Sequence, residues 1–269
     1  MILRVRHVVT CEHEALVPQA AHLLRLRPRG LAGQTVLSFT LAAAPRPTKQ
    51  RDGADHFGNP ITWMFHDASL RRLEIASEAV VALLPRPAPA ATPAWEQVAD
   101  AVRTKPWAWR EAEFAFPSPL APSLAEARAF AAASFPPGRP IAEAAACLAT
   151  RARREFRCLP GTAPGGGPDR VVIAGLRALG LPARSVTGYA PADRPPDGRL
   201  EAWASVWTGA GLGWLDLNPR EGWPDEPRIC LGWGRDRGDT DVVRGLLHGG
   251  GAPALRSVVS LDREGGEHP

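Results

Sequence analysis

The sequence has no long apolar run and no strong excess of charge of either sign. No stretch of about 18 apolar residues is present to span a bilayer, and the opening MILRVRHVVTCEHE lacks the continuous apolar segment of a secretory signal. Lysine occurs only at Lys49 and Lys105, and 32 Lys and Arg against 28 Asp and Glu give a formal net charge of +4. These cations are scattered, whereas nucleic-acid binding needs them clustered on one face. We therefore expect a cytoplasmic protein whose partners include neither nucleic acid nor membrane.

Metal-binding, disulfide and phosphate-binding patterns are also missing. The cysteines are far apart and form no CxxC pair, which is typical of reduced thiols rather than of a zinc site or a disulfide framework. The GGGP stretch at residues 165–168 is not followed by the Lys-Ser/Thr of a phosphate loop. We therefore expect no cofactor and no metal ion. The four cysteines are Cys11, Cys147, Cys158 and Cys230.

The pattern of apolar and polar positions divides the 269 residues into three regions. Residues 1–84 alternate apolar and polar side chains in short runs separated by Gly, Pro and Asp, which predicts an antiparallel β-sandwich-like domain. Residues 85–122 open with the proline-rich PRPAPAATPAW, which predicts a linker or a strap over the surface. Residues 123–269 change to a helical period and later return to strands.

The third region predicts helices followed by antiparallel strands. Ser123, with Glu126 three residues later, has the spacing of a helix capping box, and Gly180 followed by Pro182 is typical of a helix end. This order predicts an α+β fold in which the helices are segregated from an antiparallel sheet. The expected helices cover residues 123–135, 141–157 and 169–180, and the expected strands cover 183–189, 200–207 and 213–219.

Several motifs occur in an order that resembles a known family. LRALGLPARSVTGY, then EAWASVW, then GWLDLNPREG resemble the core of the bacterial transglutaminase-like family, a branch of the papain-like cysteine-protease superfamily. RHVVTCEHE, LRLRPR and DHFGNPITWMFH resemble that family's N-terminal β domain, and the helical lead-in and the closing segment also resemble it. The resemblance covers nearly the whole chain. It implies an N-terminal antiparallel β domain followed by a papain-like α+β core.

The resemblance implies a catalytic triad, and this sequence departs from it at each position. In the family a cysteine at a helix N-terminus attacks an amide, a histidine on the next strand moves the proton, and a carboxylate orients the histidine. Alignment on Arg177 puts Gly165 at the cysteine position. Glu201 stands directly before the Ala-Trp pair, at the histidine position, and Asn218 stands directly before the proline, at the aspartate position.

The three departures differ in weight. An amide such as that of Asn218 can still orient an imidazole. Glutamate cannot replace histidine as readily, because its ordinary pKa is about two units lower and it lacks the paired donor and acceptor of an imidazole ring. A missing thiol removes the nucleophile itself. The triad is therefore expected to be degenerate.

Other residues offer alternatives. Cys158 precedes the glycine loop and is either a buried small side chain or a reassigned nucleophile. Asp169 is either the N-cap of the following helix or a carboxylate paired with Glu201 in a rebuilt site. His248 lies among glycines and leucines, which predicts a loop histidine unless folding brings it to the former cleft.

Tryptophans are concentrated near the expected hairpin. Alternation places Trp203 and Trp207 on one strand face. Trp203 and Trp214 stand where the family has tryptophans, so sheet packing accounts for both of them. The fold gives less reason for Trp207, Trp223 and Trp233. Tryptophans at the rim of a cleft would suit a peptide or protein partner.

Three functions follow from these patterns. The first is a catalytically inactive, transglutaminase-like protein that keeps its scaffold to bind a peptide or protein. The second is an active protease-like or acyl-transfer enzyme with a reassigned nucleophile or a carboxylate-based site. The third is a structural subunit of a peptide-modifying assembly, because members of the family are often encoded beside ATP-grasp proteins. A fold without its usual residues does not establish the usual activity, so we favour the first.

Overall fold

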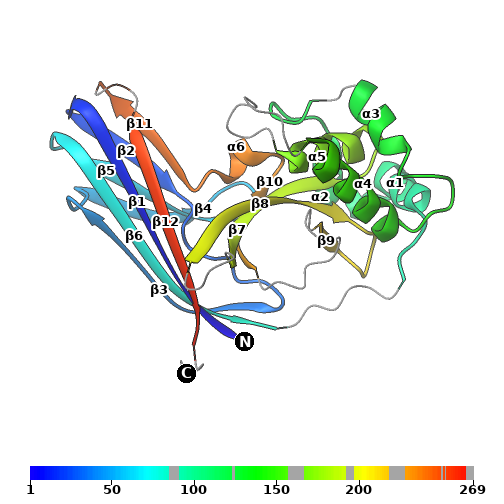
Figure 1. Ribbon diagram of the computed structural model, residues 1–269, viewed down its shortest axis with the longest axis horizontal. Coiled ribbons are helices and arrows are strands. Elements are labelled where there is room, and N and C mark those ends of the chain that lie inside the picture. The colour runs from blue at the N-terminus through cyan, green and yellow to red at the C-terminus, as the bar shows by residue number, and fades with distance from the viewer. Residues whose placement is uncertain are drawn as a thin grey trace.

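The computed structural model describes residues 1–84, 91–122, 125–156, 167–191, 197–217, 228–249, 251 and 253–264. Strands gather at one end of the molecule and helices at the other, with the long strands of the core sheet running between them (Figure 1). This is the α+β arrangement that the order of helices and strands predicted.

The N-terminal region folds into strands because its apolar residues recur at every second position. In β1 the buried side chains include Leu3, Val5, Val9 and Cys11, with exposed or half-buried residues between them. This period-two pattern places one face of the strand in a core and the other toward solvent. The strands of this region are β1 (Ile2–Val17), β2 (Gln19–Leu24), β3 (Gln34–Ala44), β4 (Lys49–Ala54), β5 (Pro60–His66) and β6 (Leu70–Leu83).

The helical region spans part of the expected linker and the start of the core. Helix α4 buries Ile141, Ala145, Leu148 and Ala152, the apolar stripe expected for a helix that packs on one side. The α-helices are α1 (Trp95–Thr104), α2 (Trp109–Ala112), α3 (Ala125–Ala132), α4 (Ile141–Phe156), α5 (Pro168–Ala178) and α6 (Arg237–Thr240). Two short 3-10 helices, η1 (Pro106–Ala108) and η2 (Glu113–Ala115), flank α2.

The remaining strands join the two ends of the molecule. They are β7 (Ala183–Pro191), β8 (Asp197–Trp207), β9 (Trp214–Leu217), β10 (Ile229–Gly234), β11 (Val243–His248) and β12 (Ala254–Arg263). Among the described residues, one sheet has the order β10-β7-β8-β12-β1-β6-β3, with β9 paired to β8, and a second has the order β11-β2-β5-β4. The closing strands β11 and β12 therefore pair antiparallel with β2 and β1 and complete the N-terminal β domain.

The core sheet and the helices share one hydrophobic core. Val172, Ile173 and Leu176 of α5 pack in one cluster with Ala204 and Val206 of β8. Each of these valine, isoleucine and leucine side chains, when fully buried, contributes about 1.5–3 kcal/mol of transfer free energy. Within the described ranges, no helix combines the length and the hydropathy needed to cross a lipid bilayer.

Candidate functional site

Three antiparallel strands position the residues that the sequence singled out. Glu201 of β8 lies opposite Gly188 of β7, and Trp203 lies opposite Val186. Residues two apart on a strand share a face, so Glu201 and Trp203 point the same way. The absence of a side chain at Gly188 makes room for Trp203, because a Cβ at residue 188 would lie 2.8 Å from its ring and 2.1 Å from the carbonyl oxygen of Ile229.

Glu201 is held between two arginines. Its Oε1 lies 3.6 Å from Nε of Arg199, and its Oε2 lies 3.6 Å from Nη2 of Arg228. The Arg228 side chain is only 6% exposed, and its guanidinium lies 5.1 Å from the centre of the Trp203 ring. Each oxygen of this carboxylate therefore lies close to one guanidinium group.

A stack of arginines and tryptophans lies beside Glu201 on the sheet. The guanidinium of Arg184 lies 4.2 Å from the centre of the Trp214 ring and 3.9 Å from that of Trp233, and Arg29 lies 3.6 Å from Trp233. Cation–π contacts at this range are favourable when the groups are removed from water, and Arg184 is a buried side chain. We call Arg184, Glu201, Trp203, Arg228 and Trp233 the Glu201 cluster.

The roles of the arginines in this cluster were not found from the sequence. Arginine is the common basic residue of the whole chain and shows no spacing that distinguishes these positions. Their partners come from other strands, so no local signal was available to identify them.

The buried cysteines among the described residues do not have the lowered thiol pKa of a catalytic cysteine. Cys230 lies on β10 opposite Gly188, and burial raises the pKa of its thiol to about 12, with Asp216 adding to the shift. Burial also raises the pKa of Cys11. An activated cysteine shows the opposite shift. Cys147 is partly buried on α4.

Asp169 does not cap its helix as expected. The N-cap of α5 is Gly167, Pro168 occupies the first turn ahead of Asp169, and no side-chain hydrogen bond caps the helix. Burial raises the pKa of Asp169, opposed by the charge of Arg237 and by hydrogen bonds from the N–H groups of residues 169 and 170. The charged neighbours of Asp169 differ from those of Glu201.

His248 and the tryptophans take places that only partly match expectation. His248 is neither a loop residue nor near α5: it is the exposed last residue of β11, paired with Gln19 of β2. Trp203 and Trp207 are both buried but belong to different clusters, with Trp203 beside Cys230 and Trp207 in the helical core, 6.0 Å from Trp107. These two positions therefore serve packing.

Of the three hairpin tryptophans, Trp203, Trp207 and Trp214, only Trp214 is partly exposed. It packs against the helical core, with the ring of Phe114 5.2 Å away. Gly165 and Asn218 lie outside the described residues, as do Cys158 and Trp223. In the parts of the chain that are described, no three His, Cys, Asp or Glu side chains gather in a way that could hold a metal ion.

Comparison with known proteins agrees with this geometry. Residues 3–82 match the bacterial transglutaminase-like N-terminal region, and residues 166–219 match the transglutaminase-like superfamily. Uncharacterized proteins from Mycobacterium tuberculosis and Mycobacterium bovis are each 30% identical to this chain over 285 aligned residues, which cover 91% of this chain and 87% of each relative.

A solved structure shares the fold. The crystal structure of a proposed cysteine protease from Cytophaga hutchinsonii matches with a TM-score of 0.74 and 16% identity, covering 100% of this chain and 92% of that one. The N-terminal β domain and the helix-backed antiparallel sheet thus define a transglutaminase-like protein. The chain belongs to the bacterial transglutaminase-like family.

Proposed function

We propose that this chain is a catalytically inactive member of its family that uses the transglutaminase-like scaffold to bind a peptide or protein. The proposal is carried by Glu201: the sequence resemblance assigns it to the family's histidine position, and its carboxylate lies between Arg199 and Arg228. A general base must be able to change its protonation state in contact with the nucleophile. The Glu201 carboxylate instead lies beside two guanidinium groups, and neither of them is a nucleophile.

The sequence supports the same conclusion at the other two positions of the triad. Gly165 supplies no nucleophile, and Asn218 supplies no negative charge to an imidazole. The family's chemistry is directed at amide groups, so a scaffold that keeps the fold without the triad would bind such a chain without cutting it. The buried core around α5 and β8 keeps this scaffold intact.

Thiol reactivity tests the loss of catalysis. The native protein is exposed to iodoacetamide between pH 5 and 9, and labelled cysteines are mapped by mass spectrometry. Cys230 and Cys11 should resist labelling because both are buried and burial raises the pKa of each thiol. No cysteine should react rapidly well below the ordinary thiol pKa of about 8.5.

An activity assay completes the test. The chain is incubated with a glutamine-containing peptide and a primary amine, and ammonia release and peptide cleavage are followed together. Neither should exceed the rate with heat-denatured protein. Rapid labelling of one cysteine near pH 6, with turnover lost when that cysteine is changed to alanine, would instead establish an enzyme with a reassigned nucleophile. Turnover without a reactive thiol would establish a carboxylate-based site.

A further inference from the structure

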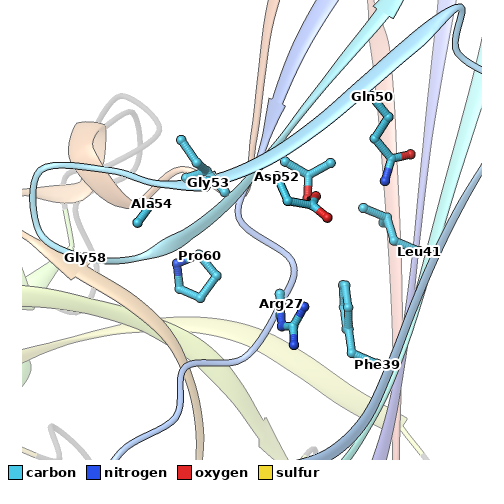
Figure 2. Close-up of a pocket in the computed structure, with 11 residues that line it drawn as sticks. Arg27, Phe39, Leu41, Gln50, Asp52, Gly53, Ala54, Gly58 and Pro60 are labelled. Carbon is cyan, nitrogen blue, oxygen red and sulfur yellow. Dashed lines mark hydrogen bonds between the residues drawn. The ribbon is translucent and has the colours of Figure 1, made fainter.

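A pocket of about 450 Å³ lies in the N-terminal β domain, outside the transglutaminase-like core. Phe39 and Leu41 of β3 form one side, and Gln50 and Asp52 of β4 approach from the other, with Arg27 between them (Figure 2). The volume lies within the range of about 300–1,000 Å³ that is typical of ligand sites. We call this space the β3–β4 pocket.

Both strands that flank the β3–β4 pocket are edge strands. Among the described residues, β3 ends one sheet and pairs only with β6, while β4 ends the other and pairs only with β5. Every residue of β4 is exposed. An edge strand offers backbone N–H and C=O groups to which a further extended chain can add.

The pocket leaves apolar surface without full cover. Phe39 and Leu41 alternate along β3 and remain half-buried, although both face the space between the sheets. The β4 residues that line the pocket opposite them include Gln50 and Asp52, which are polar. A strand added beside β4 would place every second side chain in the pocket and could cover these two apolar side chains.

The charged side chains of the pocket, Arg27 and Asp52, can make further hydrogen bonds or ion pairs to a ligand. The Arg27 guanidinium lies 5.5 Å from the centre of the Phe39 ring and makes no hydrogen bond or ion pair within the described part of the chain. Asp52 accepts one hydrogen bond at Oδ1, from the hydroxyl of Thr62 at 2.6 Å. A fitting ligand therefore offers a carboxylate to Arg27, a donor to Asp52 and an apolar group between them.

We propose that the β3–β4 pocket binds an extended peptide that adds as a strand beside β4. An acidic side chain of the peptide pairs with Arg27, an apolar side chain covers Phe39 and Leu41, and a basic side chain pairs with Asp52. The inference rests on the proposed function in taking a peptide as the partner. It does not depend on whether the core is catalytically inactive.

The test uses heptapeptides whose inward face carries the three required groups. The probes are acetyl-Thr-Glu-Thr-Leu-Thr-Lys-Thr-amide and the same peptide with Glu and Lys exchanged, because the strand could run in either direction. Titration calorimetry with the full chain should detect binding of one of these two peptides. The peptide with Gln at both charged positions should bind about tenfold more weakly, since charge-assisted hydrogen bonds are lost.

Two versions of the bound peptide test the backbone pairing. In each, alternate peptide nitrogens are methylated, so that one version blocks the N–H groups facing β4 and the other blocks those facing solvent. One version should lose binding and the other should keep it. Equal affinity of both versions, or equal affinity of free N-acetylglutamate, would show that no strand is added and would overturn the proposal.

Charge reversal tests the assigned side chain. The Arg27→Glu variant should bind the Glu-containing probe at least tenfold more weakly than the original chain does. It should instead prefer a peptide with Lys in place of that Glu. Arg256→Ala, an exposed arginine on β12, is the matched control and should bind as the original chain does. Thermal unfolding confirms that each variant folds. Unchanged preference in the Arg27 variant, or no binding of any probe to the original chain, would overturn the proposal while leaving the thiol and turnover results unaffected.

Discussion

The Glu201 cluster and the β3–β4 pocket are built from the same kinds of groups, and they differ in how those groups are used. In the Glu201 cluster each charged side chain lies against another charge or an aromatic ring, and Trp203 fills the space over Gly188. In the β3–β4 pocket Arg27 and Asp52 line a hollow of about 450 Å³. The Glu201 cluster is therefore closely packed, whereas the β3–β4 pocket is hollow.

The largest expected effect comes from adding one carbon atom at Gly188, beside the Glu201 cluster. Gly188→Ala should destabilise the protein by roughly 3 kcal/mol or more, because the new Cβ would meet the Ile229 carbonyl oxygen at 2.1 Å. Gly30→Ala, where nothing lies within 4 Å, is the control and should change stability by less than about 1 kcal/mol. Chemical denaturation compares the two variants. Similar stabilities would show that the Glu201 cluster has spare room.

Acid should weaken the N-terminal β domain through a buried histidine. Burial, with His66 and His13 nearby, lowers the pKa of His22 to about 4, below its ordinary value of 6.5. The unfolded chain then binds a proton that the folded chain excludes, so the free energy of unfolding falls between pH 6.5 and 4, by roughly 3 kcal/mol for this group.

The variant His22→Gln isolates this effect. Its free energy of unfolding should depend less on pH in that window, measured by urea denaturation at pH 7, 5.5 and 4. His248→Gln, at an exposed position, should keep the original pH dependence. If His22→Gln kept it as well, the acid sensitivity would come from other groups.

A smaller effect is expected from neutralising Glu201. Glu201→Gln keeps the shape of the side chain and removes the charge beside Arg199 and Arg228, which should cost about 1–2 kcal/mol of stability. Glu14→Gln, an exposed position on β1, is the control and should be neutral. Unchanged or increased stability of the Glu201 variant would mean that the carboxylate is kept for a purpose other than structure.

The smallest effect concerns an exposed contact between the N-terminal β domain and the helical region. His56 of the β domain lies 2.8 Å from Glu113 of η2, with 71% of the histidine side chain exposed. Exposed pairs of this kind contribute about 0–1 kcal/mol, so His56→Ala should lower the melting temperature by only a few degrees. If calorimetry resolved two separate unfolding transitions in this variant alone, the pair would couple the β domain to the helical region more strongly than an exposed pair is expected to.

The sequence predicted the parts of the structure that local patterns control. Period-two alternation identified the strands of residues 1–84 apart from β4, whose residues are all exposed, and the apolar stripe from Ile141 to Ala152 identified α4. The family motifs placed Glu201 on the strand before an Ala-Trp pair. The expected cap at Asp169 was wrong, and Pro168 was the signal that could have corrected it, because proline favours the first helical position and shifts the cap to Gly167.

Long-range pairing explains what the sequence could not reveal. Arg228 reaches Glu201 from a segment after β9, and β3 and β4 enclose a pocket although they belong to different sheets. His248 was expected in a loop because its neighbours are glycines and leucines, but pairing of β11 with β2 draws it into a strand. No local period encodes which distant strand will be a partner.

The pairing of β12 with β1 sets the order in which this protein can form during synthesis. Leu3 pairs with Arg263, so β1 gains this neighbouring strand only after β12 has left the ribosome. Helices α3 to α5 pack with one another over much shorter stretches of chain and can form earlier. The β domain, although it comes first in the sequence, is therefore completed only after the helical region has been made, and until then the emerging chain holds an unfinished sheet.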